Sequence, residues 1–186
     1  MKTLDHAKVT DAVRVATREV FSMMMGMEVE AEPAYEEANS TGNVDGVVAL
    51  IGLAGQWTGG GVVQCDAPLA RKFYASLLMT ECDPANEGIS EEVLDAVAEI
   101  ANMIIGNVKN AMERDLGPIG LGIPSVVYGR NFTTRSAGSN WIVNPFVCGG
   151  GRLLVKFCLT PPTSAAAGLP ELVGREFPRS KHPAIA

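Results

Sequence analysis

The sequence predicts an α+β domain in which long helices pack against an antiparallel sheet. Three observations support this prediction. Residues 89–115 repeat apolar side chains at helical spacing, runs of β-branched residues are separated by glycine-rich turns, and helices alternate with groups of strands. The order is helix, three strands and helix, followed by helix and three strands, so we expect a two-repeat architecture.

Length and composition are those of one globular domain with an added tail. The chain has 186 residues, of which 47% are hydrophobic and 19% are charged. A chain of this length buries about 70% of its unfolded surface. After Thr160 the composition becomes small, polar and proline-rich. We therefore expect a domain at residues 1–160 and a tail at residues 161–186 that is disordered or lies along the surface.

Charge and hydropathy argue against two classes of function. The net charge is −6, whereas nucleic-acid binding needs clustered Lys and Arg. No apolar run approaches the ~18 residues of a membrane span, and the opening residues MKTLDHAKVTD contain no apolar signal core. The sequence thus predicts a cytoplasmic protein that binds no nucleic acid and does not insert into a membrane.

The cysteines lack the spacing of a metal site. No two of them form a C-x-x-C motif, which disfavours structural zinc. Reduced, mostly buried thiols are the expected state of such cysteines in a cytoplasmic protein. The four are Cys65, Cys82, Cys148 and Cys158.

The first half of the chain begins with a predicted helix at residues 5–25, which Gly26 ends. Four methionines lie near its end, at positions 23–25 and 27. Core or interface packing explains them better than a soft-metal site, because no cysteine or histidine lies nearby. The apolar residues at helical spacing are Val9, Val13, Ala16, Val20 and Met24.

Three strands and a second helix are expected next. Residues 54–61, AGQWTGGG, lack the Gly-Lys-Ser/Thr of a phosphate loop, and we interpret them as a hairpin turn. Asp66 then caps a helix at residues 67–79, with Pro68 in its first turn. The expected strands are residues 28–35, 44–53 and 58–66, of which the second reads as a central strand.

The second half begins with the longest predicted helix, at residues 89–115. Ser90 is a favourable N-cap, and Gly117 followed by Pro118 ends the pattern. One side of this helix is apolar along its whole length. The opposite side, here called the polar ridge, consists of Glu92, Asp95, Glu99, Asn102, Gly106, Asn110 and Glu113.

Three strands are predicted after this helix. The last two form a hairpin around the glycines at 149–151. Pro124 favours an edge or bulge position for the first strand, and residues 131–139 are interpreted as a loop or an irregular strand. The expected strands are residues 122–128, 141–148 and 152–159.

Two side chains of the polar ridge are spaced for joint use. Glu99 and Asn102 lie three residues apart on the helix and therefore project together. Gly106, one turn further along, costs the helix roughly 1 kcal/mol relative to Ala but lets another surface come close. The alternative interpretation is a solvated helix face without a role, because charged helix faces are common.

The run from Asp95 to Asn107, DAVAEIANMIIGN, resembles the signature helix of the CheX-type chemotaxis phosphatases. These proteins form one family with CheC and FliY and act on phosphorylated CheY-like response regulators. The resemblance covers most of residues 5–160 and implies a CheX/CheC-like fold of two repeats. Two-site relatives also carry Glu-x-x-Asn on the first helix, which this chain lacks, so it resembles the single-site CheX proteins.

The resemblance also implies roles for individual residues. Asn102 would orient the attacking water, since an amide both donates and accepts hydrogen bonds, and Glu99 would pair with a lysine of the regulator. The regulator would supply the phosphorylated aspartate and Mg²⁺, so we expect no metal or cofactor in this chain. The implied partner-binding residues are Asp95, Met103, Gly106 and Asn107.

Hydrolysis by a nucleophile of this chain is disfavoured. His6 and His182 lie near opposite ends, so a Ser–His or Cys–His pair is hard to assemble. Two alternatives to a phosphatase stay open. One is a catalytically silent module that binds the regulator, and the other is a scaffold in a motor or signalling assembly.

A homodimer formed through the sheet is expected. Residues 122–128 and 141–159 are apolar, and Lys156 is their only lysine, whereas free sheet edges usually carry lysines. A second copy of the chain is the simplest cover for such an edge. The alternative is a monomer whose edge is shielded by the proline-rich tail.

Overall fold

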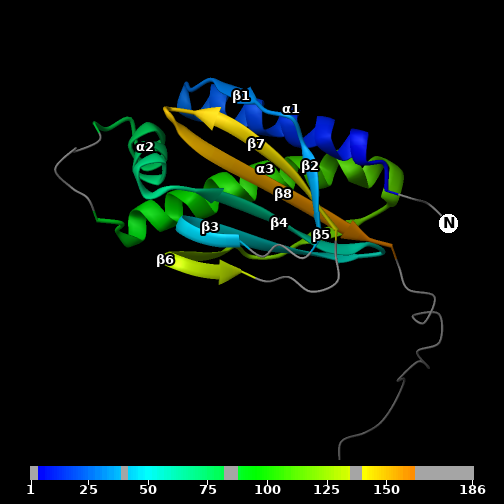
Figure 1. Cartoon of the computed structure of the whole chain (residues 1–186). Helices are drawn as coiled ribbons and strands as arrows, with labels where there is room; N and C mark the ends of the chain where they lie inside the picture. Colours follow the sequence, from blue (N-terminus) through cyan, green and yellow to red (C-terminus); the bar gives the residue numbers. More distant parts are fainter. Residues whose placement is uncertain (1–3, 39–41, 82–87, 135–139, 162–186) are drawn as a thin grey trace, which may run out of the picture.

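The computed structural model describes residues 4–38, 42–81, 88–134 and 140–161. Within them, eight antiparallel strands form one layer, and three helices cover one face of it (Figure 1). The predicted α+β class is confirmed. The helices are α1 (His6–Met25), α2 (Ala67–Leu77) and α3 (Glu91–Leu116). The strands are β1 (Val29–Ala31), β2 (Tyr35–Ala38), β3 (Gly42–Gly55), β4 (Thr58–Cys65), β5 (Ile119–Leu121), β6 (Ser125–Thr134), β7 (Asn140–Cys148) and β8 (Gly151–Thr160).

The strands of the two repeats are interleaved. Across the sheet the order is β1, β7, β8, β4, β3 and β5, while β2 also pairs with β7 and β6 with β3. The hairpins β3–β4 and β7–β8 meet at the central β4–β8 pair. The strands before each hairpin cross to the other repeat, because β1 and β2 pair with β7 whereas β5 and β6 pair with β3. The predicted two-repeat order is thus present as two intertwined halves.

A proline interrupts strand pairing at two places in the chain. β1 and β2 replace the single strand expected at residues 28–35, with Pro33 in the gap. The strand expected at residues 122–128 begins only at Ser125, as β6, and an additional strand that was not expected, β5, precedes it, with Pro124 in the gap. Proline lacks the N–H that a ladder requires, so each gap is where pairing lapses. β6 continues through residues 131–134 as the irregular strand that was one of the two interpretations of residues 131–139, because Asn131 has a φ of 52° and the register against β3 shifts between Val44 and Gly46. Residues 135–139 lie outside the described part of the chain.

Both predicted hairpins are confirmed. Gly149 and Gly150 join β7 to β8 with φ values of 55° and 79°. Positive φ at both turn residues gives the type I′ turn, whose twist matches that of the paired strands. Gln56 and Trp57 join β3 to β4, and the Trp57 side chain is buried in the main core.

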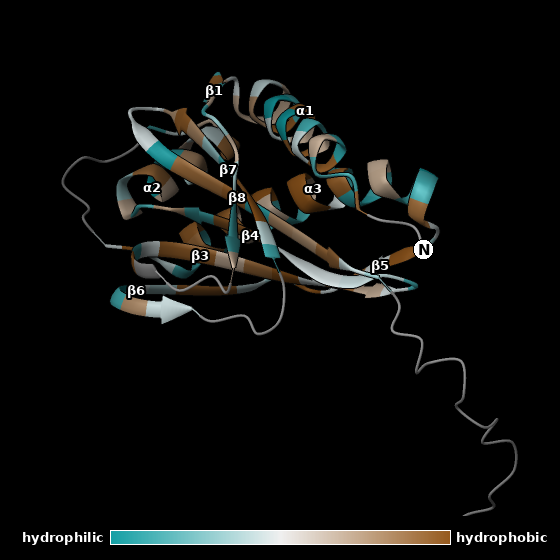
Figure 2. Ribbon diagram, turned by 45° about the vertical axis from the view of Figure 1, so that its right-hand side comes forward, coloured by the Kyte–Doolittle hydropathy of each residue, from teal (hydrophilic) through white to brown (hydrophobic). Residues whose placement is uncertain are grey.

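The main core lies between the helices and the sheet. Figure 2 shows hydrophobic residues along the central strands and on the helix sides that face them. In α1 the predicted apolar residues are buried except Met24, which is half exposed because Met25 occupies the core position. Met23 is also exposed and Met27 is partly buried, so only part of the methionine cluster packs in the core.

The opposite face of the sheet also carries buried apolar side chains. Lys156 lies among them in the strand register, and its Nζ is 2.8 Å from Glu37 Oε2. Strands with apolar side chains on both faces read as continuous apolar runs, as β3 does. The buried residues of this second cluster are Val44, Val48, Val62, Trp141, Val143 and Cys158.

The prediction of a free sheet edge at residues 141–159 is wrong. β7 is paired with β8 on one side and with β1 and β2 on the other, and β8 lies between β7 and β4. Their lack of lysine reflects a central position, since central strands need no protection against further pairing. β6, by contrast, pairs only with β3 in the described part of the chain. Residues 125–128 of the other expected edge segment therefore do lie at an edge.

Two of the three helices begin with an aspartate cap. Asp5 accepts hydrogen bonds from the backbone N–H groups of α1, and Asp66 does the same for α2. Ser90 occupies the N-cap position of α3, but its side chain makes no capping bond. A hydrogen bond from Ser90 instead lowers the pKa of Glu92. The predicted helix positions are confirmed, although α2 ends at Leu77.

The three cysteines in the described residues are buried and form no disulfide, as predicted; Cys82 lies outside that part of the chain. Burial raises the pKa of Cys65 far above its ordinary range. Burial also raises the pKa of Cys148 to about 11, against the opposing charge of Lys72. A thiol with such a pKa is not a thiolate at neutral pH, so neither group is a ready nucleophile.

Glu113 fastens the end of α3 to β5. Its carboxylate accepts hydrogen bonds from Lys109 Nζ at 2.9 Å and from the backbone N–H of Ile119 at 2.7 Å. These two bonds hold the pKa of Glu113 below its ordinary value. The junction sets where α3 ends relative to the sheet edge.

We expect Glu113→Gln to lower Tm at pH 7 and to weaken the dependence of Tm on acid. A carboxyl whose folded-state pKa lies below the unfolded value, about 4.3, stabilises the fold above that pH. This contribution is lost as the pH falls through the lowered pKa. Thermal unfolding from pH 7 to pH 3 measures it, with the exposed Glu19→Gln as control. Equal behaviour of the two variants would contradict the role given to Glu113.

Candidate functional site

The residues singled out from the sequence all lie on α3. Asp95, Glu99 and Asn107 are exposed, and Asn102 and Gly106 are half-buried. The Glu99 and Asn102 side chains are one turn apart. Within the described part of the chain neither side chain has a hydrogen-bond or ion-pair partner. The pair is thus available to a group from outside.

A buried helix face supports this pair. Ile100 and Ala101 follow Glu99 directly, and Ile104 and Ile105 follow Asn102; all four are buried. Met103 also packs partly against the core, so the structure places it between the core and the surface. A site on a rigid, well-packed helix holds its side chains more closely than a site on a loop.

Close contact between α3 and β4 seats the helix on the sheet. A Cβ at Gly61 would lie 2.5–2.6 Å from three carbon atoms of Ile105. Only a residue without a side chain allows Ile105 to lie directly against this strand. The glycine run of residues 59–61, which the sequence assigned both to the hairpin turn and to the start of a strand, lies within β4, and Gly61 sets the distance of α3 from the sheet.

The polar ridge is bordered by the sheet edge at β5. A Cβ at Gly106 would lie 3.6 Å from Leu121 Cδ2, which is an ordinary van der Waals distance. α3 also contacts β6. Because Gly106 has no side chain, the surface of α3 does not protrude where Leu121 of β5 lies against it. Ile123 follows β5 and is 90% exposed.

Sequence reasoning missed Ile123, because it placed this residue inside a strand. The nearby signal was Pro124, which interrupts pairing in the ladder and leaves the segment between β5 and β6 outside it.

The first helix carries a different pair at the corresponding place. Counting back from the glycine that follows each helix, α1 has Lys8 and Asp11 where α3 has Glu99 and Asn102. Lys8 forms an ion pair with Asp115 at the end of α3. The α1 side chain at the position of Glu99 is thus engaged within the protein.

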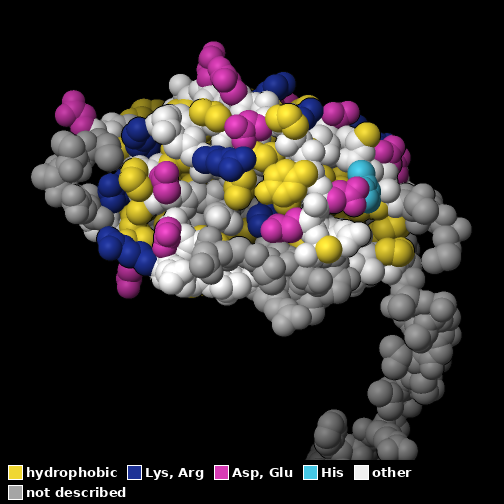
Figure 3. Space-filling model, in the orientation of Figure 1, with side chains coloured by type: hydrophobic (Ala, Val, Ile, Leu, Met, Phe, Trp, Pro, Cys, Tyr) yellow, Lys and Arg dark blue, Asp and Glu magenta, His cyan; other side chains and the backbone are white. Residues whose placement is uncertain are grey.

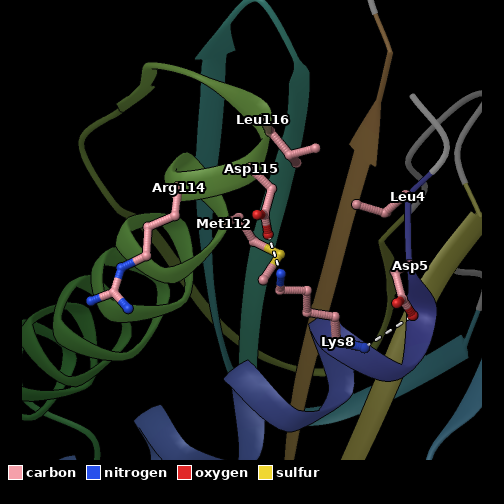
Figure 4. Close-up of a pocket in the computed structure, with 7 residues that line it drawn as sticks. All are labelled: Leu4, Asp5, Lys8, Met112, Arg114, Asp115 and Leu116. Atoms are coloured by element: carbon pink, nitrogen blue, oxygen red, sulfur yellow. Dashed lines mark hydrogen bonds and ion pairs between the residues drawn. The ribbon is translucent and has the colours of Figure 1, made fainter. Parts of the chain in front are cut away.

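A pocket of about 450 Å³ lies where the start of α1 meets the end of α3 (Figure 4). Its charged groups have structural partners, because Lys8 binds Asp115 and Asp5 caps α1. Arg114 points away from these groups in Figure 4. The pocket does not bring a nucleophile and a general base together. We therefore interpret it as a structural junction between the two helices.

Other reactive constellations are absent from the described residues. No three His, Cys, Asp or Glu side chains in them converge as a metal site. His6 Nδ1 lies 2.7 Å from Glu36 Oε1 on the surface. No described helix is long and apolar enough to cross a membrane. On the face in Figure 3, basic side chains lie among acidic and apolar ones.

Comparison with solved structures finds the same fold in chemotaxis proteins. CheX from Desulfovibrio desulfuricans is 27% identical with a TM-score of 0.71, over 82% of this chain and 99% of that chain. CheX from Vibrio vulnificus is 24% identical with a TM-score of 0.71, over 82% and 99%. A CheX–CheY–BeF3–Mg²⁺ complex from Borrelia burgdorferi contains a chain 21% identical with a TM-score of 0.64, over 84% and 99%.

No curated protein sequence matches the chain. The family described as chemotaxis phosphatase CheX matches residues 47–147, which include α3 and its polar ridge. This match covers more than half of the sequence. The chain therefore belongs to the CheX family of chemotaxis phosphatases.

Proposed function

We propose that this chain is a phosphatase that hydrolyses the aspartyl phosphate of a CheY-like response regulator. The observation that carries the proposal is the Glu99–Asn102 pair, presented one turn apart on a core-packed helix of a CheX-family fold. The solved Borrelia complex, in which a CheX protein is bound to CheY with BeF3 and Mg²⁺, supports the choice of partner.

Asn102 orients the water that attacks phosphorus. The water oxygen forms a bond to phosphorus in line with the breaking bond between phosphorus and the aspartate oxygen. The products are inorganic phosphate and a free carboxylate on the regulator. Catalysis of phosphoryl transfer rests mainly on positioning and charge stabilisation. An amide suits this task, because its oxygen accepts a bond from water while its NH₂ group donates one.

Glu99 anchors the pair in the regulator's active site. An ionised carboxylate only accepts hydrogen bonds, and its approach to an acidic pocket is favourable only if a cation meets it. A lysine of the regulator is that cation in our proposal, and the bond between them is charge-assisted. The exposed position of Glu99 leaves it free to reach this lysine.

The regulator supplies the remaining parts of the site. These are the phosphorylated aspartate and the Mg²⁺ that neutralises charge on the phosphoryl oxygens. This chain contributes two side chains and a rigid helix, without a metal or cofactor. Asp95, Met103, Gly106 and Asn107 form the surrounding contact surface in this proposal.

Phosphate release from regulators of the same organism tests the proposal. Each regulator is phosphorylated and mixed with substoichiometric amounts of this protein, and inorganic phosphate is followed over time. We expect many turnovers per molecule with at least one regulator. Stoichiometric binding without release would identify a silent binding module instead. Co-purification in a large assembly without release would identify a scaffold.

We also propose that the chain forms a homodimer through its sheet. β6 offers backbone N–H and C=O groups along its outer side, and Val127 and Tyr128 on it are exposed. A second β6 is the simplest partner for such an edge. Light scattering over a dilution series, with and without residues 161–186, measures the mass. We expect a dimer in both, whereas a monomer throughout would refute it.

A further inference from the structure

We propose that Ile123 is a docking residue for the receiver domain of the regulator, beside the polar ridge. The inference rests on the proposed phosphatase function and adds the apolar contact that holds the two proteins together. Ile123 lies between β5 and β6 and its side chain is 90% exposed.

The polar ridge alone is too small to bind a protein. From Asp95 to Gly106 it is about 17 Å long and roughly 10 Å wide, from the rise and diameter of a helix. Its footprint is therefore on the order of 170 Å², whereas specific complexes bury about 800 Å² on each partner. A regulator seated over Glu99 and Asn102 must also contact the surfaces beside α3.

One of these surfaces is the segment after β5. Leu121 lies against the Gly106 position of α3. Ile123 is two residues further, so its Cα lies no more than roughly 16 Å from that of Gly106, given the reach of the chain and of a leucine side chain. A receiver domain that covers the ridge is wide enough to reach it.

The backbone holds Ile123 in a defined position. The Gly122 N–H donates to Gly52 O at 2.8 Å, which continues the pairing of β5 with β3. Pro124 restricts the residue before it to extended conformations. The segment between β5 and β6 contains one extra residue relative to β3, because Leu121 pairs with Leu53 whereas Ser125 pairs with Leu50. Ile123 is thus held between two strands that both pair with β3.

An apolar side chain held in this way is suited to be an anchor. Energetically important interface residues lie in apolar centres from which neighbouring contacts exclude water. A preorganised backbone reduces the ordering cost of binding. The partner that fits is a receiver domain with an apolar patch next to its phosphorylated aspartate. The ridge supplies the polar contacts and Ile123 the apolar one.

Steady-state dephosphorylation by Ile123→Ala tests the inference. We expect KM to rise about tenfold with kcat nearly unchanged, as the loss of most of one buried apolar side chain predicts. Affinity for the beryllofluoride form of the regulator, in Mg²⁺ and measured by fluorescence anisotropy, should fall by the same factor. Ile123→Leu should restore both values.

Met23→Ala is the matched control, because Met23 is 80% exposed and lies on α1, whereas Ile123 follows β5 at the sheet edge. Unchanged KM in Ile123→Ala, or an equal rise in both variants, would overturn the inference while wild-type turnover persists. Absence of turnover in the wild-type protein would refute the phosphatase function itself. The two failures are therefore distinguishable.

Discussion

Replacing Asn102 by Ala is expected to lower kcat for regulator dephosphorylation by about 10²–10³-fold, the usual effect of removing one preorganised hydrogen-bonding group from a catalytic site. The reason is that Asn102 holds the attacking water, and alanine can neither donate to it nor accept from it. KM should change little. Inorganic phosphate release under multiple-turnover conditions measures both constants.

Asn110→Ala is the control for this prediction. Asn110 is exposed on the same helix, beyond Gly106. It should keep wild-type turnover, and both variants should keep the wild-type Tm because neither residue lies in the core. An Asn102→Ala protein with full turnover would refute the proposed mechanism, even if it still bound the regulator.

The same assay tests Glu99. Glu99→Gln keeps the size of the side chain and removes its charge, so it separates the ion pair from packing. We expect KM to rise and kcat to fall, because the contact of Glu99 with the regulator lysine is weakened both in the bound complex and in the transition state. Asp95→Asn removes a charge one turn earlier and should have a smaller effect.

The second large effect is expected from Gly61→Ala. The added Cβ would clash with three carbon atoms of Ile105, a buried β-branched side chain with little freedom to move. α3 must therefore shift away from β4. Overpacking of this kind costs about 1–3 kcal/mol of unfolding free energy. Chemical denaturation measures the loss, and turnover should fall as the helix that carries Asn102 moves.

Two further variants make this test specific. Gly52→Ala is the control, because no atom lies within 4 Å of a Cβ at that position of β3. Ile105→Ala removes the clashing atoms, so the double variant Gly61→Ala/Ile105→Ala should lose less stability than the two single variants together. Additive losses would show that the two positions do not meet as described.

Local patterns predicted much of this fold. The apolar periodicity of α3 and the paired glycines before β8 depend on neighbours in the sequence, so their signals could be followed residue by residue. The interruptions at Pro33 and Pro124 were not predicted as strand boundaries, although Pro124 favoured an edge or bulge position, because a proline marks where pairing can lapse but not where the next strand begins. The central position of β7 and β8 depends on strands from the other repeat, and no local pattern contains that information.

The candidate site shows the same division. Spacing alone predicted that Glu99 and Asn102 project together, because three residues along a helix define a common direction, whereas their roles were implied only by the resemblance to the CheX-type proteins. The role of Gly61 in seating α3 could not be predicted in this way, since it becomes visible only when β4 and the helix are in contact. The approach of β5 to Gly106 was likewise hidden, because the strand itself was not expected.

The crossing of strands between the two repeats has a consequence for folding. During synthesis the first repeat emerges before the second-repeat strands with which it pairs. At that stage β2 still lacks β7, and β3 still lacks β6. The sheet closes only when distant parts of the chain meet, and such non-local topologies fold slowly. Until then the apolar β3 has a bare edge, which favours aggregation or exchange of strands between copies. The arrangement that joins the two halves in the native state thus makes a nascent chain dependent on the timely arrival of its second half.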